Sequence, residues 1–226
     1  MKRTLKRQET LQKVYWKEKC NFMGKVEVEH RGRLTAEKFK ELKDFLDKQG
    51  KFLGVNERFS IIYNCSKEGE LNRSPIDLKL RITNKKTDLV LKHGDWSGGD
   101  ARKEFIFPVE TEKFEEMVEF LRILGFFHGV LQATKTHLYE HRGVEVALVD
   151  VPGWGYYFEV EAVVDEDNIE KANKEIEEEC QILGIEKLND SDFCDLLKSL
   201  NDRPGYRFNF EKENFSKVKS RFTDYF

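Results

Sequence analysis

The sequence predicts an α+β fold: an eight-stranded antiparallel β tunnel, closed or nearly closed into a barrel, with amphipathic helices packed outside. Three observations support this prediction. Eight runs of alternating side chains are typical of strands, tight turns join two pairs of these runs, and several runs have one charged face and one apolar face. Eight antiparallel strands are enough to close or nearly close a barrel.

The strands are expected between short turns and longer loops. They lie at about 25–33, 57–65, 76–83, 86–93, 102–109, 127–141, 143–151 and 156–164. Asn84-Lys85 separates the third run from the fourth, and a turn near Arg142-Gly143 separates the sixth from the seventh. Connections this short are typical of antiparallel hairpins.

Amphipathic helices are expected between the strands. Thr35 fits an N-cap for a helix that includes residues 36–46, and Gly50 fits its end. The segment 111–121 repeats the pattern of 36–46, and a glycine and then an aromatic residue follow each copy, which suggests a βα unit used twice. Further helices are expected at about 167–183 and 191–200.

The chain divides into three parts by composition. Residues 1–24 form a polar, basic N-terminal extension, residues 25–200 form the tunnel domain, and residues 201–226 form a polar and aromatic tail. The tail has no clear period, and a lid over the tunnel is its candidate role.

Composition limits the compartment and the partners. The net charge is −3 and the pI is near 6.1, so no basic field favours nucleic acid, and no nucleic-acid partner is expected. The four cysteines lie far apart, which favours a reducing compartment, and the cytoplasm is the expected location. No run approaches the ~18 apolar residues that span a bilayer, so no membrane partner is expected. A homodimer is left open.

Charged residues alternate with apolar ones on most of the strands. Lys79 and Arg81 share one face, for example, while Leu80 lies on the other. The usual interpretation is a wet outer face. However, amphipathic helices need an apolar surface to cover, so we expect the apolar faces outside and the charged faces inside. Because a dry interior with so much charge would be costly, the sequence predicts a water-filled bore that binds a polyanion and metal.

Two pairs of acids are the strongest signal of a site. Glu27 and Glu29 share a face of the first strand with Arg31, and Glu159 and Glu161 share a face of the last strand. A single pair of this kind is more often a solvated strand face. Two pairs that converge would make an oxygen-rich cage for Mg²⁺ or Mn²⁺, which is the cofactor we expect.

With these motifs in order, the chain resembles the triphosphate tunnel metalloenzyme superfamily, also called CYTH after bacterial class IV adenylate cyclase and thiamine triphosphatase. The family's ExExK strand is matched by residues 27–31, and its closing acids are matched by Asp150, Glu159 and Glu161. The basic strands between them are matched by Lys79, Arg81, Lys92, the RxE motif at Arg102 and Glu104, and Lys135. Order and spacing agree over about residues 25–200.

The resemblance implies a tunnel that binds triphosphate-bearing small molecules, and it implies a role for each matched residue. The implied metal ligands are Glu27, Glu29, Asp150, Glu159 and Glu161. The implied substrate-binding residues are Arg31, Lys79, Arg81, Lys92, Arg102, Lys135 and His137. The residues expected to take part in catalysis are Glu27, Glu29, Lys92, Lys135 and Glu161.

Three departures from the family pattern leave the substrate open. Arg31 replaces the usual lysine; it still binds phosphate but cannot act as a base near neutral pH. His137 stands where a KxR pattern has its second basic residue, so its charge there depends on pH. The strand at 57–65 lacks the acid often found beside the family's tyrosine, here Tyr63.

The favoured function is metal-dependent hydrolysis of a triphosphate-bearing substrate: inorganic triphosphate, a nucleoside triphosphate or thiamine triphosphate. This reaction needs only the polyphosphate and an activated water. An adenylate cyclase of the class IV type, which makes cyclic AMP and pyrophosphate from ATP, would share almost all of the same residues. A non-catalytic module that binds polyphosphate or nucleotide is the third interpretation.

Overall fold

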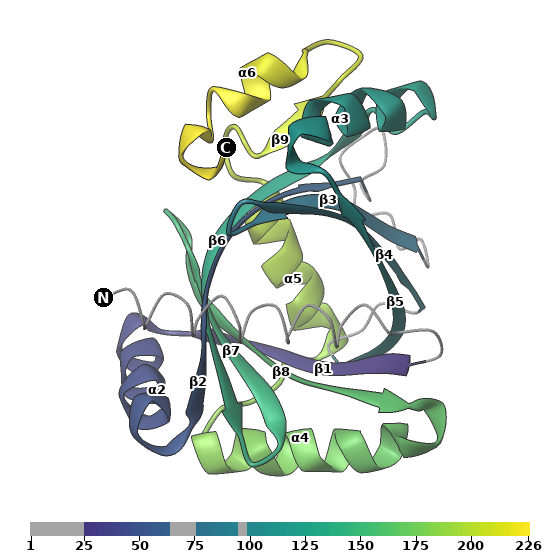
Figure 1. The fold of residues 1–226 in the computed structure, drawn as a ribbon. Coiled ribbons are helices and arrows are strands. Elements are labelled where there is room, and N and C mark those ends of the chain that lie inside the picture. The colour runs from purple at the N-terminus through teal and green to yellow at the C-terminus, as the bar shows by residue number, and fades with distance from the viewer. Residues whose placement is uncertain (1–24, 64–75, 95–98) are drawn as a thin grey trace, which may run out of the picture.

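The computed structural model describes residues 25–63, 76–94 and 99–226, with the backbone alone for residues 99–101. Its centre is an antiparallel β barrel, which Figure 1 shows along its axis. The strands follow one another in the order β2-β3-β4-β5-β1-β8-β7-β6, and pairing between β2 and β6 closes the ring. The eight-stranded antiparallel barrel predicted from the sequence is therefore confirmed.

The strands are β1 (Lys25–Leu34), β2 (Lys51–Ile62), β3 (Ile76–Thr83), β4 (Lys86–His93), β5 (Gly99–Val109), β6 (His128–His141), β7 (Val144–Val151) and β8 (Gly155–Asp165). A short ninth strand, β9 (Arg207–Asn209), pairs with the start of β6. These bounds agree with the predicted ones to within a few residues, except at β2.

Strand β2 begins at Lys51, well before the predicted start near residue 57. A β-bulge lies between Phe52 and Gly54, and Gly54 has a φ of 142°. The bulge interrupts the alternation of side chains, so the pattern that marks a strand is hidden until Glu57. At the other end, the last two residues of the predicted run lie outside the described residues.

Two tight turns form the predicted hairpins. Asn84 and Lys85, with φ values of 49° and 65°, join β3 to β4. Arg142 and Gly143, with φ values of 51° and 88°, join β6 to β7. Positive φ at both central residues is the geometry of a type I′ turn, whose twist matches that of the flanking strands.

The helices are α2 (Ala36–Gln49), α3 (Phe114–Ile123), α4 (Ile169–Leu183), α5 (Asp190–Asn201) and α6 (Phe215–Lys219). Thr35 caps α2 as predicted, because its hydroxyl accepts a hydrogen bond of 3.1 Å from the backbone N–H of Lys38. The two similar segments, 36–46 and 111–121, occupy corresponding places. One connects β1 to β2, the other connects β5 to β6, and the strands of the two units pair with each other.

The apolar faces of the strands point outward beneath the helices. Leu46 of α2 and Ile176 of α4 are fully buried against Val28, Phe158 and Val160, which lie on the outer side of β1 and β8. Burying one such aliphatic side chain contributes about 1.5–3 kcal/mol relative to leaving it exposed. Because the helices take up the apolar faces, the charged faces are left to the interior.

The C-terminal tail lies on the outer face of the barrel. Phe208, Phe215 and Phe222 join a buried cluster with Phe59 and Leu80 on the outer side of β2 and β3. The ring centroids of Phe59 and Phe222 are 4.8 Å apart. The tail therefore covers apolar strand surface and does not form a lid across the bore.

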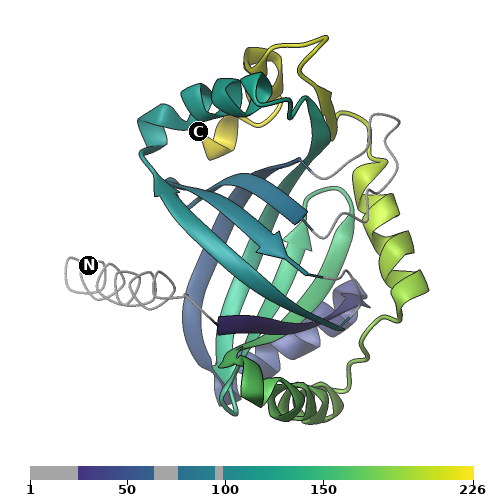
Figure 2. The same cartoon turned by 90° about the vertical axis from the view of Figure 1, so that its right-hand side faces the viewer.

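Helix α5 covers one end of the barrel. Figure 2 shows it at the right of the view, standing across the strands. Leu196 and Leu200 of α5 pack against Val149, Val151 and Tyr157, which β7 and β8 turn inward. The bore is thus charged in its middle and apolar at the α5 end.

Among the described residues, no helix is long and apolar enough to span a membrane.

Candidate active site inside the barrel

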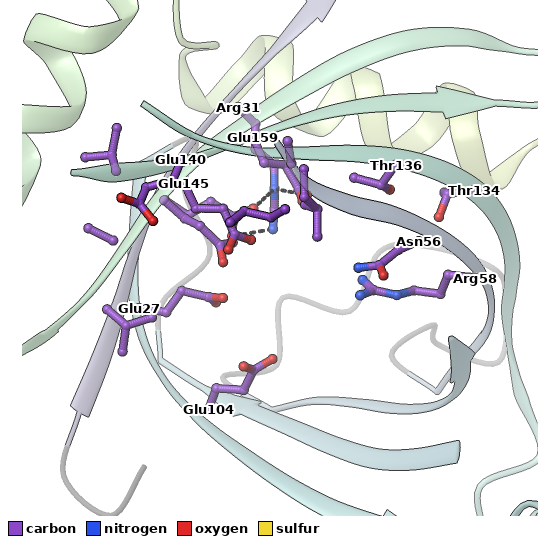
Figure 3. Close-up of a pocket in the computed structure, with 18 of the residues that line it drawn as sticks. Glu27, Arg31, Asn56, Arg58, Glu104, Thr134, Thr136, Glu140, Glu145 and Glu159 are labelled. Carbon is purple, nitrogen blue, oxygen red and sulfur yellow. Dashed lines mark hydrogen bonds and ion pairs between the residues drawn. The ribbon is translucent and has the colours of Figure 1, made fainter. Parts of the chain in front are cut away.

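The barrel encloses a cavity of about 590 Å³ whose walls are inward-facing strand side chains. Figure 3 shows Glu27 and Glu145 on one side of it and Arg58 on the other. Small-molecule sites in proteins commonly have volumes of about 300–1,000 Å³. The cavity is therefore large enough for a ligand of the size of a triphosphate.

Three buried carboxylates meet on the β1–β8 side of the cavity. Glu27 and Glu29 alternate along β1, and Glu161 is the direct partner of Glu29 on β8. Oxygens of all three lie within 4.8 Å of one another, and the residues are 7%, 3% and 8% exposed. Carboxylates this close repel one another when water is excluded, unless a cation balances them. This set of oxygen donors fits Mg²⁺ or Mn²⁺.

Lys92 of β4 brings a positive charge to this cluster. Its ammonium group binds Glu27 directly and lies 3.8 Å from Glu29 and 3.9 Å from Glu104. Burial by itself would lower the pKa of Lys92, but the carboxylates of Glu27, Glu104 and Glu29 outweigh burial and raise it. Lys92 is therefore a permanent cation beside the acids.

Arg31 holds two of the acids of β1 and β8. Its Nε and Nη2 donate to the two oxygens of Glu29 at 2.7 and 2.5 Å, and Nε also donates to Glu159 at 3.0 Å. Burial opposes ionisation of Glu29, but Arg31 and Lys92 prevail and lower its pKa. Burial and the neighbouring Glu29 carboxylate raise the pKa of Glu159. Glu159 therefore lines the cavity beside Glu29, and Arg31 binds both carboxylates.

Further inward cations come from β3 and β5, and buried acids accompany them. Lys79 lies 2.8 Å from Asp77, which also lies 3.7 Å from Arg102. Arg81 lies 3.6 Å from Asp88. Asp77, Asp88 and Arg102 are at most 2% exposed, so these pairs are shielded from water. Burial lowers the pKa of Lys79, with Asp77 acting against it.

Comparison with known families identifies this arrangement. The model of the CYTH domain family matches residues 25–192, which is most of the chain. The chain belongs to the CYTH family. The resemblance to the triphosphate tunnel metalloenzymes found from the motifs is therefore confirmed, and enzymes of this family depend on divalent metal ions.

Solved structures share the fold of this CYTH protein at low sequence identity. The PH1819 protein of Pyrococcus horikoshii OT3 is 22% identical with a TM-score of 0.62, covering 77% of this chain and 98% of its own. The PH1012 protein of the same organism is 23% identical with a TM-score of 0.58, covering 71% and 91%. The Hippeastrum protein HpAC1, described as a candidate adenylyl cyclase with a dominant triphosphatase activity, is 18% identical with a TM-score of 0.52, covering 80% and 98%. No curated protein matches the chain.

The interior of the CYTH barrel brings together most of the residues singled out from the sequence. Glu27, Glu29, Arg31, Lys79, Arg81, Lys92, Glu159 and Glu161 line the cavity. Arg102 is buried behind this wall, close enough to Glu29 to lower its pKa.

Lys135, His137 and Asp150 do not reach the cavity, and their predicted placement is corrected here. Lys135 pairs in register with Asp150 on the outer face and lies 3.7 Å from the exposed Glu57. The ring of His137 packs edge-on against Phe39 of α2, outside the barrel. Both faces of β6 include polar side chains, so alternation did not tell which one turns inward. On β7, Asp150 is in phase with the apolar residues of the outer face.

The inward charged residues that were missed from the sequence include Arg58, Asp77, Asp88, Glu140 and Glu145. The signal was present for three of them. Arg58 alternates with Phe59 and Ile61, while Asp77 and Asp88 are in phase with Lys79 and Lys92 respectively. Glu145 is opposite Glu161 across β7 and β8, a relationship that depends on register and not on local pattern.

Proposed function

We propose that this CYTH protein hydrolyses a triphosphate-bearing small molecule in the barrel cavity with the help of Mg²⁺ or Mn²⁺. One observation carries the proposal: a cluster of buried carboxylates and a set of buried cations share one enclosed cavity. Neither half suffices alone, because a polyanion needs the cations and a divalent ion needs the acids.

Glu27, Glu29 and Glu161 are the residues that would hold the divalent ion. A bound ion would supply Lewis-acid stabilisation of the charge on the phosphate oxygens. Lys92 bridges the two halves of the site, since its ammonium lies among the acids and next to the basic strands.

Lys79 and Arg81 line the cavity and would bind phosphate oxygens, while the charge of Arg102, buried behind them, would add to the attraction. Each of them lies near a buried aspartate, Asp77 or Asp88, so its position is fixed before substrate arrives. Phosphoryl transfer needs little covalent chemistry from the protein. Positioning and electrostatic stabilisation of spreading charge supply most of the rate enhancement, and fixed cations perform both.

The wall made by β2 and β6 is polar but contains few charges. Asn56, Ser60, Gln132, Thr134 and Thr136 line it. Hydroxyl and amide groups there would exclude bulk water from part of the substrate and still donate hydrogen bonds to it.

The test is to incubate the protein separately with inorganic triphosphate, ATP and thiamine triphosphate, each with Mg²⁺ or Mn²⁺, and to identify the products. Release of phosphate from at least one of them, lost in Glu161→Gln, is the expected result. Glu57→Gln is the matched control, because Glu57 is exposed on the outer face.

The same assay separates the alternatives. Cyclic AMP and pyrophosphate as the main products from ATP would replace hydrolysis by the cyclase reaction. Tight, metal-dependent binding without turnover of any of the three substrates would leave a non-catalytic binding module.

A further inference from the structure

The side chains that β6 turns into the cavity carry no positive charge. They are Gln132, Thr134, Thr136, Leu138 and Glu140, all of which line the cavity. The two basic side chains of the same stretch, Lys135 and His137, face outward. A phosphate group next to this wall would therefore find hydroxyl and amide groups on β6 but no cation.

The neighbouring strand β2 brings a cation to the same place. Arg58 is the direct partner of Thr134 in the pairing of β2 with β6, and Asn56 is the partner of Thr136. Residues opposite each other in an antiparallel pair point to the same side of the sheet. Figure 3 shows Arg58 and Asn56 beside Thr134 and Thr136, with Arg58 reaching into the cavity.

We propose that Arg58 binds the phosphate chain from the β2–β6 wall and takes the place of the cation expected on β6. This inference rests on the proposed function, because it assigns a further substrate-binding residue to the same site.

The position of Arg58 is fixed by a buried neighbour. Its Nε donates a hydrogen bond of 3.0 Å to the hydroxyl of Thr83, which is 2% exposed and is its partner on β3. On the same two strands, Ser60 is the partner of Arg81, so Arg81 is the diagonal neighbour of Arg58. Two guanidinium groups on adjacent strands therefore face the same part of the cavity.

Arg58 also lies across the bore from the carboxylate cluster. In the closed ring, β2 is separated from β1 by β3, β4 and β5 on one side and by β6, β7 and β8 on the other. A polyphosphate that reaches the acids of β1 through a divalent ion would extend across the bore toward β2. Arg58 is then the far end of a basic arc that continues through β3, β4 and β5 with Arg81, Lys92 and Arg102.

A guanidinium suits this role better than an amine would. Its planar N–H groups match two phosphate oxygens at once, and it stays charged at every physiological pH. Loss of a hydrogen bond to a charged group should therefore weaken binding about tenfold or more.

The test measures binding without turnover. The probe is the imido analogue of inorganic triphosphate, whose P–N–P links resist hydrolysis, titrated calorimetrically into the full chain in the presence of Mg²⁺. Four proteins are compared: wild type, Arg58→Gln, Arg58→Lys and Lys135→Gln. We expect Arg58→Gln to bind about tenfold more weakly or worse, Arg58→Lys to recover part of the loss, and Lys135→Gln to bind as wild type does.

A variant that keeps the charge guards against a folding defect. Thr83→Val removes the acceptor that orients Nε, and we expect it to weaken binding less than Arg58→Gln does; thermal unfolding verifies that each variant is folded. Arg58→Gln binding within about twofold of wild type, or Lys135→Gln losing as much as Arg58→Gln, would overturn the inference. Wild-type binding of the analogue without hydrolysis of any of the three substrates would end the proposed function but leave Arg58 as a binding residue. Failure of the wild type to bind the analogue would overturn the inference about Arg58, and the product assay with ATP and thiamine triphosphate would then decide the proposed function separately.

Discussion

Glu29 and Glu161 are direct partners across β1 and β8, and both carboxylates are buried inside the barrel. Like charges opposite each other on a sheet are destabilising. Arg31 and Lys92 balance the negative charge of Glu29. Even so, carboxylate oxygens of Glu27, Glu29 and Glu161 lie within 4.8 Å of one another. The fold therefore gives up stability to keep these acids together, which is characteristic of a site that binds a cation.

Glu161→Gln is expected to abolish stabilisation by metal. A ligand present at about 100 times its Kd stabilises a folded protein by about 2.7 kcal/mol. In wild type, Mn²⁺ or Mg²⁺ should raise the midpoint of thermal unfolding, and in Glu161→Gln the rise should disappear. An undiminished rise in the variant would remove Glu161 from the metal site.

Asp77→Asn is expected to destabilise the fold strongly. Asp77 is 1% exposed and lies beside Lys79 and Arg102, so its loss leaves two buried cations less well balanced. Removing one member of a buried ion pair typically costs about 3–5 kcal/mol, which urea unfolding can measure. Glu115→Gln, which breaks the exposed pair with Lys219, should cost less than about 1 kcal/mol. Equal losses in the two variants would show that the interior pair is not shielded from water.

Phe222→Ala tests whether the C-terminal tail stabilises the fold or acts as a lid over the cavity. Phe222 is 8% exposed and packs on Phe59 outside the barrel, so we expect a loss of about 3–5 kcal/mol in the free energy of unfolding. The turnover rate, measured at a temperature where the variant is still folded, should stay close to that of wild type. A large fall in turnover with unchanged stability would instead assign the tail a role at the cavity.

Stability is expected to decrease as the pH falls below about 6.5, the ordinary pKa of histidine. Burial, and then the charges of Lys43 and Lys135, lower the pKa of His137 in the folded protein. The unfolded chain therefore binds a proton at a pH where the folded protein does not, and acid favours unfolding. Thermal midpoints at about pH 7.5 and 5.5 should differ less in His137→Gln than in wild type. An identical pH dependence in both proteins would exclude His137 as a contributor.

Much of the barrel was predictable from local pattern. Strands β1, β3, β4, β5 and β8 each have one charged and one apolar face. Because the amphipathic helices pack on the apolar faces from outside, the charged faces must point into the barrel. Residues such as Glu27, Lys79 and Glu161 were therefore placed inside correctly. The hairpin turns were also predictable, because Asn84-Lys85 and Arg142-Gly143 are short and adopt a backbone twist that matches their strands.

The inward face of β6 and β7 depended on the closed ring. Alternation tells which residues share a face, but both faces of β6 include polar side chains. Only the pairing of β6 with β2 and β7 sets Thr134 inward and Lys135 outward. In the same way, the position of α5 over one end of the bore, and that of the tail on the outside, follow from long-range packing of Leu196 and Phe222. Such contacts join residues far apart in the chain, so no local period in the sequence records them.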